Sequence, residues 1–121
     1  MSGRDRLRYP EEVVEKAIRM LDNAIRNLTQ LIVDGKASQL FEEVHALVVE
    51  LARSAAWSYE LIYDLNLVIE RLNMLAHYAK AVEIRYFYLG SKRIQGSIKY
   101  IEGHLLEILN ILRSIRDLIK Q

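Results

Sequence analysis

Apolar residues recur every three or four positions along most of the chain, the spacing that places side chains on one face of an α-helix. The first such stripe consists of Val14, Ile18, Leu21, Ile25, Leu28 and Ile32. Pro10 suits the first turn of a helix, because its missing N–H would be unbonded there anyway. Asp34 and Gly35 follow the stripe, and glycine readily takes the left-handed conformation that ends a helix. The pattern therefore predicts a helix over residues 10–33.

The next run, residues 36–89, contains neither glycine nor proline, so no strong breaker interrupts a helix within it. Its apolar stripe keeps one phase and is interrupted only by Ser58: Phe41, Val44, Val48, Leu51, Ala55, Ile62, Leu65, Ile69, Leu72, Ala76 and Ala79. One continuous helix would be roughly 80 Å long, and a chain built around it would have to be an intertwined oligomer. Typical helix lengths favour two helices instead, residues 38–54 and 58–89, which separate near Trp57. Ser38 is then the expected N-cap of the first of them.

Residues 91–120 follow a stop at Gly90 and carry the most regular pattern of the chain. Their apolar positions are Ile94, Ile98, Ile101, Leu105, Ile108, Leu112, Ile115 and Ile119, spaced 4-3-4-3-4-3-4 as in coiled coils. Gly96 and Gly103 are costly inside a helix, which indicates that another helix approaches closely at these points.

Together the stripes predict an all-α protein. The expected fold is an antiparallel four-helix bundle with helices at residues 10–33, 38–54, 58–89 and 91–120. Fusion of the two middle helices into one long helix is the alternative. A length of 121 residues fits one domain, so residues 10–121 are expected to form a single helical domain after a basic arm at residues 1–9.

The segment 58–89 differs from the other predicted helices because its polar face is narrow. Outside the stripe it also carries Leu61, Leu67, Val68, Leu75, Val82, Ile84, Tyr86 and Tyr88. A helix that is apolar nearly all round is buried on more than one side. It is therefore either the centre of the fold or a subunit interface, and we favour a homo-oligomer that associates through residues 58–89.

Composition narrows the cellular setting. The chain has no cysteine, which excludes disulfides, thiolate metal sites and cysteine nucleophiles. Its charged N-terminus is followed by no apolar signal segment, and its longest uncharged stretch, residues 72–79, is far too short to span a membrane. We expect a cytoplasmic or otherwise intracellular protein, not secreted by a signal peptide and without a membrane partner.

Basic residues gather in the N-terminal arm (residues 1–9) and in residues 85–99, although the formal net charge is only +1. Residues 85–99 hold four basic residues and no acid, and they include the aromatic run 86–88. Basic side chains contact phosphates and aromatic rings stack on bases, which predicts nucleic acid as a ligand. The candidate binding residues are Arg4, Arg6, Arg8, Arg85, Lys92, Arg93 and Lys99. The alternative is that the aromatic residues close the core at a helix end.

Charges at the predicted helix ends have a simpler explanation. The acids Glu11, Glu12 and Glu15 open the first helix and the bases Arg113, Arg116 and Lys120 close the last, a distribution that the helix macrodipole favours without any partner.

Motifs for metal or covalent chemistry are weak. Glu42 and His45 form the chain's one Glu-x-x-His pair, whereas di-iron carboxylate bundles need two such pairs and two further glutamates. No Gly-x-Ser-x-Gly turn or glycine-rich phosphate loop is present. We therefore expect no metal and no cofactor.

Residues 71–78, which read Arg-Leu-Asn-Met-Leu-Ala-His-Tyr, resemble the Arg-x(4–6)-His signature of HEPN domains. These are small all-helical dimers that often act as metal-independent ribonucleases. The resemblance implies that Arg71 and His77 are a catalytic pair acting on the RNA backbone, with Asn73 as an accessory polar group. The sequence departs from the family by having Leu72 after the arginine, where asparagine is usual, and by placing Tyr78 directly after the histidine. The structural alternative is an arginine and a histidine at the margins of a buried helix.

The sequence thus predicts a non-enzymatic, self-associating helical protein with a structural or interaction role. Nucleic acid is the candidate ligand of its basic arm and of the tip between the last two helices, as in a coat- or nucleoid-like assembly. The alternative is a HEPN-like ribonuclease or toxin that uses Arg71 and His77.

Overall fold

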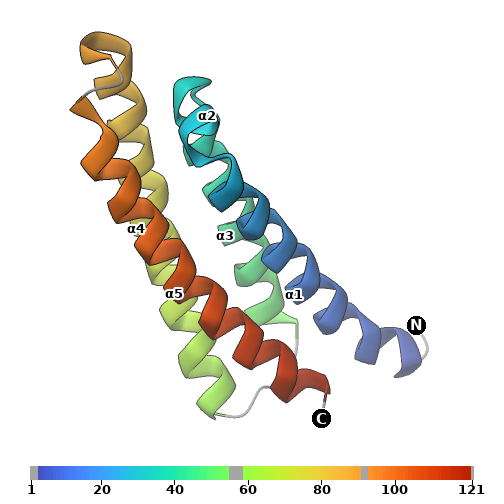
Figure 1. The fold of residues 1–121 in the computed structure, drawn as a ribbon. Helices are drawn as coiled ribbons and strands as arrows, with labels where there is room; N and C mark the ends of the chain where they lie inside the picture. Colours follow the sequence, from blue (N-terminus) through green and yellow to red (C-terminus); the bar gives the residue numbers. More distant parts are fainter. Residues whose placement is uncertain (1–2, 55–58, 91–92, 121) are drawn as a thin grey trace.

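The computed structural model describes residues 3–54, 59–90 and 93–120, with side chains from Pro10 onward. Its helices are α1 (Gly3–Arg26), α2 (Leu28–Val33), α3 (Ala37–Arg53), α4 (Tyr59–Leu89) and α5 (Gln95–Lys120). In Figure 1, α1 and α2 run up, α3 runs down, α4 runs up and α5 runs down. Both α1 and α4 pack against α3 and α5, whereas α1 does not contact α4 over the described residues. The predicted all-α bundle is confirmed.

The long glycine-free run is divided into two helices. The first of them, α3, ends at Arg53, and the N–H and hydroxyl groups of Ser54 both donate to the carbonyl of Leu51 (3.2 and 2.9 Å). The second, α4, begins at Tyr59 and returns along α3, which it contacts more extensively than any other pair of helices. The alternative of one fused helix is therefore wrong. The expected break at Trp57 lies outside the described residues.

The apolar stripes of the four predicted helices meet in one core. Its largest fully buried side chains include Leu21, Ile32, Phe41, Leu51, Leu65, Leu72, Leu75, Ile101, Leu105 and Ile108. On α4 the buried face also includes Val68 and Val82, whereas Ile62, a member of the predicted stripe, is exposed. The core is therefore closed within a single chain, and the apolar positions of α4 exceed what that core uses.

The first helix differs from the prediction at both ends. It begins at Gly3, seven residues before Pro10, so the proline lies inside α1 and not in its first turn. It ends at Arg26, and Asn27, with a φ of −120° and a ψ of 22°, separates α1 from α2. The Nδ2 of Asn27 donates to the carbonyl of Asn23 (3.0 Å), the kind of local side-chain bond by which asparagine competes with regular helix.

The turn from α2 to α3 contains Gly35 in the left-handed conformation that the sequence predicted. Gly35 has a φ of +71°. Its N–H donates to the carbonyl of Ile32 (3.1 Å), and the N–H of Lys36 donates to that of Leu31 (2.8 Å). These two bonds form a Schellman motif, which satisfies the last carbonyls of a helix.

The start of α3 is stabilised by a residue far away in sequence. Ser38, expected as its N-cap, lies instead within the first turn and is buried. Its backbone N–H donates to Oε1 of Glu83 on α4 (3.1 Å). A buried carboxylate from a neighbouring helix therefore binds at the positive end of α3, in the place that a local cap usually takes.

Candidate interaction surface

One side of α4 faces away from the helices that it packs against, α2, α3 and α5. The positions that form this side follow a straight helical line and are all exposed: Tyr59, Tyr63, Asn66, Glu70, Asn73, His77, Ala81, Ile84 and Tyr88. We call this set the α4 outer face. Its only acidic member is Glu70, and it has no lysine or arginine. Solvent-facing helix surfaces are usually rich in charge, so this face is unusually poor in charge.

Many outward positions of α1 and α3 are charged, as expected. Those of α3 include Glu42, Glu43, Glu50 and Arg53, and those of α1 include Glu12, Lys16, Arg19 and Arg26. The α4 outer face therefore carries less charge than the outward sides of α1 and α3, while α5 also exposes the apolar side chains of Tyr100, Leu106 and Leu118.

The exposed side chains on this face are large. Tyr59 is 95% exposed, Tyr63 69% and Tyr88 76%. Ile84 lies on the face itself, while Ile62, Met74 and Phe87 lie beside it, and all four are exposed. These side chains form a cluster at each end of the face, with Met74 beside its middle, and clusters of exposed apolar side chains mark interaction sites in soluble proteins.

Arg71 and His77, the residues of the HEPN-like segment, point to different surroundings. Arg71 reaches toward α5, where its guanidinium lies 2.8 Å from Oε2 of Glu107 in an ion pair. His77 is exposed on the α4 outer face, with its Nδ1 2.8 Å from the carbonyl of Asn73. Because a carbonyl oxygen only accepts, Nδ1 donates this bond and Nε2 is left for other partners. Within one chain, the structure does not bring Arg71 and His77 together.

The basic residues predicted for nucleic acid are divided between the two ends of the bundle. Arg85, Arg93 and Lys99 are exposed around the connection from α4 to α5, which lies at the opposite end from the N-terminus in Figure 1. The side chains of Arg4, Arg6 and Arg8 and the whole of Lys92 fall outside the described parts of the chain.

Of the three aromatic residues at this tip, Tyr86 is half-buried and packs against the core, whereas the other two do not. Phe87 is 80% exposed and meets Tyr88 edge to face, with ring centroids 5.2 Å apart. The sequence left open whether these rings are core or surface, and the structure places Phe87 and Tyr88 at the surface.

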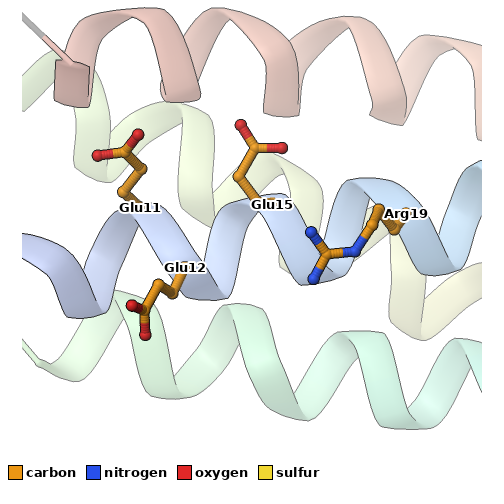
Figure 2. A pocket seen from close by; sticks show the side chains of 4 residues that line it. All are labelled: Glu11, Glu12, Glu15 and Arg19. Atoms are coloured by element: carbon orange, nitrogen blue, oxygen red, sulfur yellow. The ribbon is translucent and has the colours of Figure 1, made fainter.

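An acidic hollow lies along α1, lined by Glu11, Glu12, Glu15 and Arg19 (Figure 2). Figure 2 shows Glu11 and Glu15 extending toward α5 and Glu12 pointing away from it. The ammonium group of Lys120 is 3.7 Å from Glu11 and 3.5 Å from Glu15.

Two further ion pairs join the same helices. Arg116 lies 3.8 Å from Glu15, and Arg113 lies 3.4 Å from Asp22. Because α1 begins at Gly3, these acids are not in its first turn, and the macrodipole does not explain them. They form instead an ion-pair ladder along the antiparallel contact of α1 with α5.

The Glu-x-x-His pair stays isolated on α3, where Glu42 is exposed and His45 half-buried. Among the described residues, no three His, Asp or Glu side chains are grouped so that they could hold a metal ion. No helix in the described part of the chain has the length and apolarity needed to cross a bilayer.

The fold and this surface define an all-α helical bundle with one exposed apolar helix face. No protein-family model, curated protein or solved structure matches the chain.

The sequence pattern correctly indicated that α4 carries more apolar side chains than one face can hold. It did not indicate which polar residues share the exposed face with them. Glu70 and His77 lie on the same line as the exposed tyrosines. A second stripe at 4-3 spacing, offset from the core stripe, was the available signal. Periodicity alone does not tell which of two stripes faces the core.

Proposed function

We propose that this protein is a non-enzymatic helical interaction protein that associates with itself through the α4 outer face. The observation that carries the proposal is the row of exposed tyrosines and isoleucine on that face, Tyr59, Tyr63, Ile84 and Tyr88. The core is already complete within one chain, so these side chains have no structural use in a monomer.

The exposed area is of the size that a stable contact needs. A whole tyrosine side chain presents on the order of 200 Å². At the exposed fractions given above, Tyr59, Tyr63 and Tyr88 together present on the order of 500 Å² per chain. A standard interface buries about 800 Å² per partner. Ile62, Ile84 and Phe87, which are also exposed, supply most of the difference.

Self-association is tested by measuring mass against concentration, by light scattering and sedimentation equilibrium. The wild type is expected to exceed its chain mass of 14.1 kDa at micromolar concentration. Ile84→Lys is expected to weaken association at least tenfold, because it removes a half-exposed apolar contact and introduces a charge that must be desolvated.

Ser114→Lys is the matched control. Ser114 is exposed on α5, so this variant adds the same charge to a different face and should associate like the wild type. Circular dichroism verifies that both variants stay helical. A mass of one chain at every wild-type concentration would refute the proposal, as would equal weakening by both substitutions.

Nucleic acid is a second candidate ligand, favoured by the exposure of Phe87 and Tyr88 beside exposed Arg85 and Arg93. Rings that are open to solvent next to basic side chains suit stacking on single-stranded bases. The test is fluorescence anisotropy with single-stranded DNA and RNA at 50 and at 200 mM salt. Binding should fall steeply with salt and weaken in Phe87→Ala. Absence of binding at the lower salt would remove this candidate.

The same RNA samples address the ribonuclease alternative. Incubated without metal, they should be cleaved if Arg71 and His77 act as the HEPN resemblance implies, and cleavage should be lost in His77→Ala. Intact RNA with the wild-type protein would count against that alternative.

A further inference from the structure

We infer that two copies of this chain pair through their α4 outer faces in antiparallel orientation, about a two-fold axis that passes between Asn73 and Met74. The inference rests on the proposed self-association and adds its geometry, its register and its end point. The order of side chains along α4 supports it, because the side chains of one copy complement those of a second copy that runs in the opposite direction.

The midline of the face shows this complementarity directly. In an antiparallel pair of helices, residues equally distant from the two-fold axis lie opposite one another. The axis between Asn73 and Met74 then sets Tyr59 against Tyr88 of the second copy and Tyr63 against Ile84. Aromatic and aliphatic side chains therefore meet at both ends of the contact.

The polar members of the face match in the same register. The axis places Glu70 opposite His77 of the second copy, once on each side of the centre. Because Nδ1 of His77 donates to the carbonyl of Asn73 (2.8 Å), its Nε2 is the ring atom on the side of the carboxylate, and it donates to that carboxylate as part of the doubly protonated imidazolium. Glu70 and His77 then carry opposite charges beside the centre of the contact, where Asn73 lies.

Charges beside the midline agree as well. Exposed acids occupy the first half of α4, with Glu60 beside the face, and exposed bases occupy the second half, with Lys80 and Arg85. Glu60 and Arg85 lie on the same flank, so the two-fold axis brings Glu60 of one copy within reach of Arg85 of the other.

A parallel pairing would set Glu70 on the midline against Glu70 of the second copy, and it would put the flank that carries Glu60 and Arg85 on opposite sides of the two copies, so these two residues could not pair. Opposed like charges disfavour an interface, so the charge order selects the antiparallel arrangement. A two-fold contact uses the same patch on both partners and closes on itself. The expected product is a dimer and not a growing filament.

A charge exchange tests the register. Glu60→Arg alone and Arg85→Glu alone should each dimerise about tenfold more weakly than the wild type, because the symmetric contact contains the repulsion twice. An equimolar mixture of the two variants should recover wild-type affinity, since every flank contact then joins Arg to Glu. The double variant Glu60→Arg/Arg85→Glu should also dimerise like the wild type. Sedimentation equilibrium gives all four constants.

Cross-linking supplies a second readout, because the chain has no cysteine of its own. Glu60→Cys mixed with Arg85→Cys should be joined by a short bismaleimide, whereas neither variant alone should be. In the antiparallel pair two copies of residue 60 are roughly 40 Å apart, at 1.5 Å of rise per residue.

The outcomes separate this inference from the proposed function. A wild-type protein that stays monomeric refutes self-association, and the pairing geometry with it. A wild-type dimer whose single variants are unaffected, or whose mixture remains as weak as the single variants, leaves self-association standing and overturns the antiparallel register. Linkage of Glu60→Cys to itself would overturn the register too.

Discussion

Glu83 offers a sharp test of how this bundle is held together, because it is a charged side chain only 8% exposed. Its Oε1 accepts the N–H of Ser38 in the first turn of α3 (3.1 Å), while its Oε2 is buried and has no hydrogen-bond partner among the described residues. Glu83→Gln keeps the shape of the side chain, removes its charge and replaces one acceptor oxygen by an N–H₂ group. The perturbation therefore isolates the carboxylate.

Two effects set the magnitude. A negative charge at a partly buried helix N-terminus stabilises by about 0.3–2 kcal/mol, and this is lost. The new amide N–H₂ group takes the place of Oε2 and leaves buried donors unbonded, at about 1–3 kcal/mol. Relief from burying a charge offsets part of this loss. We expect Glu83→Gln to lower the free energy of unfolding by about 1–2 kcal/mol, or Tm by about 5 °C.

Urea unfolding followed by circular dichroism measures the change. Wild type and variant are compared at one protein concentration, because self-association raises apparent stability by mass action. Glu102→Gln, a substitution at an exposed position of α5, is the control and should change stability by less than about 0.5 kcal/mol. Hydrogen exchange adds a local readout, since the amide of Ser38 should exchange faster in Glu83→Gln.

A variant as stable as the wild type, or more stable, would refute the reasoning. It would show that the free-energy cost of burying the Glu83 carboxylate is at least as large as the stabilisation from its contact with the start of α3. Loss of stability without faster exchange at Ser38 would place the effect elsewhere in the core.

Three further predictions concern stability in the same urea assay. Phe41→Ala should cost about 3–5 kcal/mol, because Phe41 is fully buried; a loss below 1 kcal/mol would contradict its place in the core. Gly35→Ala should cost about 1–2 kcal/mol through its φ of +71°, since an added Cβ would come no closer than 3.5 Å to Glu83. Gly103→Ala should stabilise by about 0.5–1 kcal/mol, because an added Cβ would have open space around it; destabilisation would indicate that another chain packs there.

The glycines show both the strength and the limit of local reasoning. Gly35 and Gly90 end helices with positive φ, at +71° and +81°, as their positions after apolar stripes predicted. Gly96 and Gly103 were expected to mark close helix contacts, yet among the described residues no other side chain or helix comes within 4 Å of where a Cβ would lie at either position. Glycine at a helix end has a backbone reason that sequence shows, whereas glycine inside a helix depends on neighbours that it does not show.

The start of α3 illustrates a second limit. Ser38 had the residue type and position of an N-cap, but Glu83 binds its N–H from another helix. Likewise Glu11 and Glu15 suited a helix start by sequence, whereas in the fold they pair with Lys120 of α5. Both errors have the same cause. A charged side chain distant in sequence binds a group for which the local sequence pattern predicted an interaction within its own helix.

The sequence by itself determined the helices, their order and most of the core, because 3.6-residue periodicity is a local property that each segment carries alone. Only the tertiary structure decided which of the two apolar sides of α4 is used within the chain. Leu65, Leu72 and Ala79 pack inward, and Tyr63 and Ile84 are left at the surface. That choice follows from packing, since α3 and α5 cover one side of α4 and leave the other open. The open side is the surface on which the proposed dimer depends.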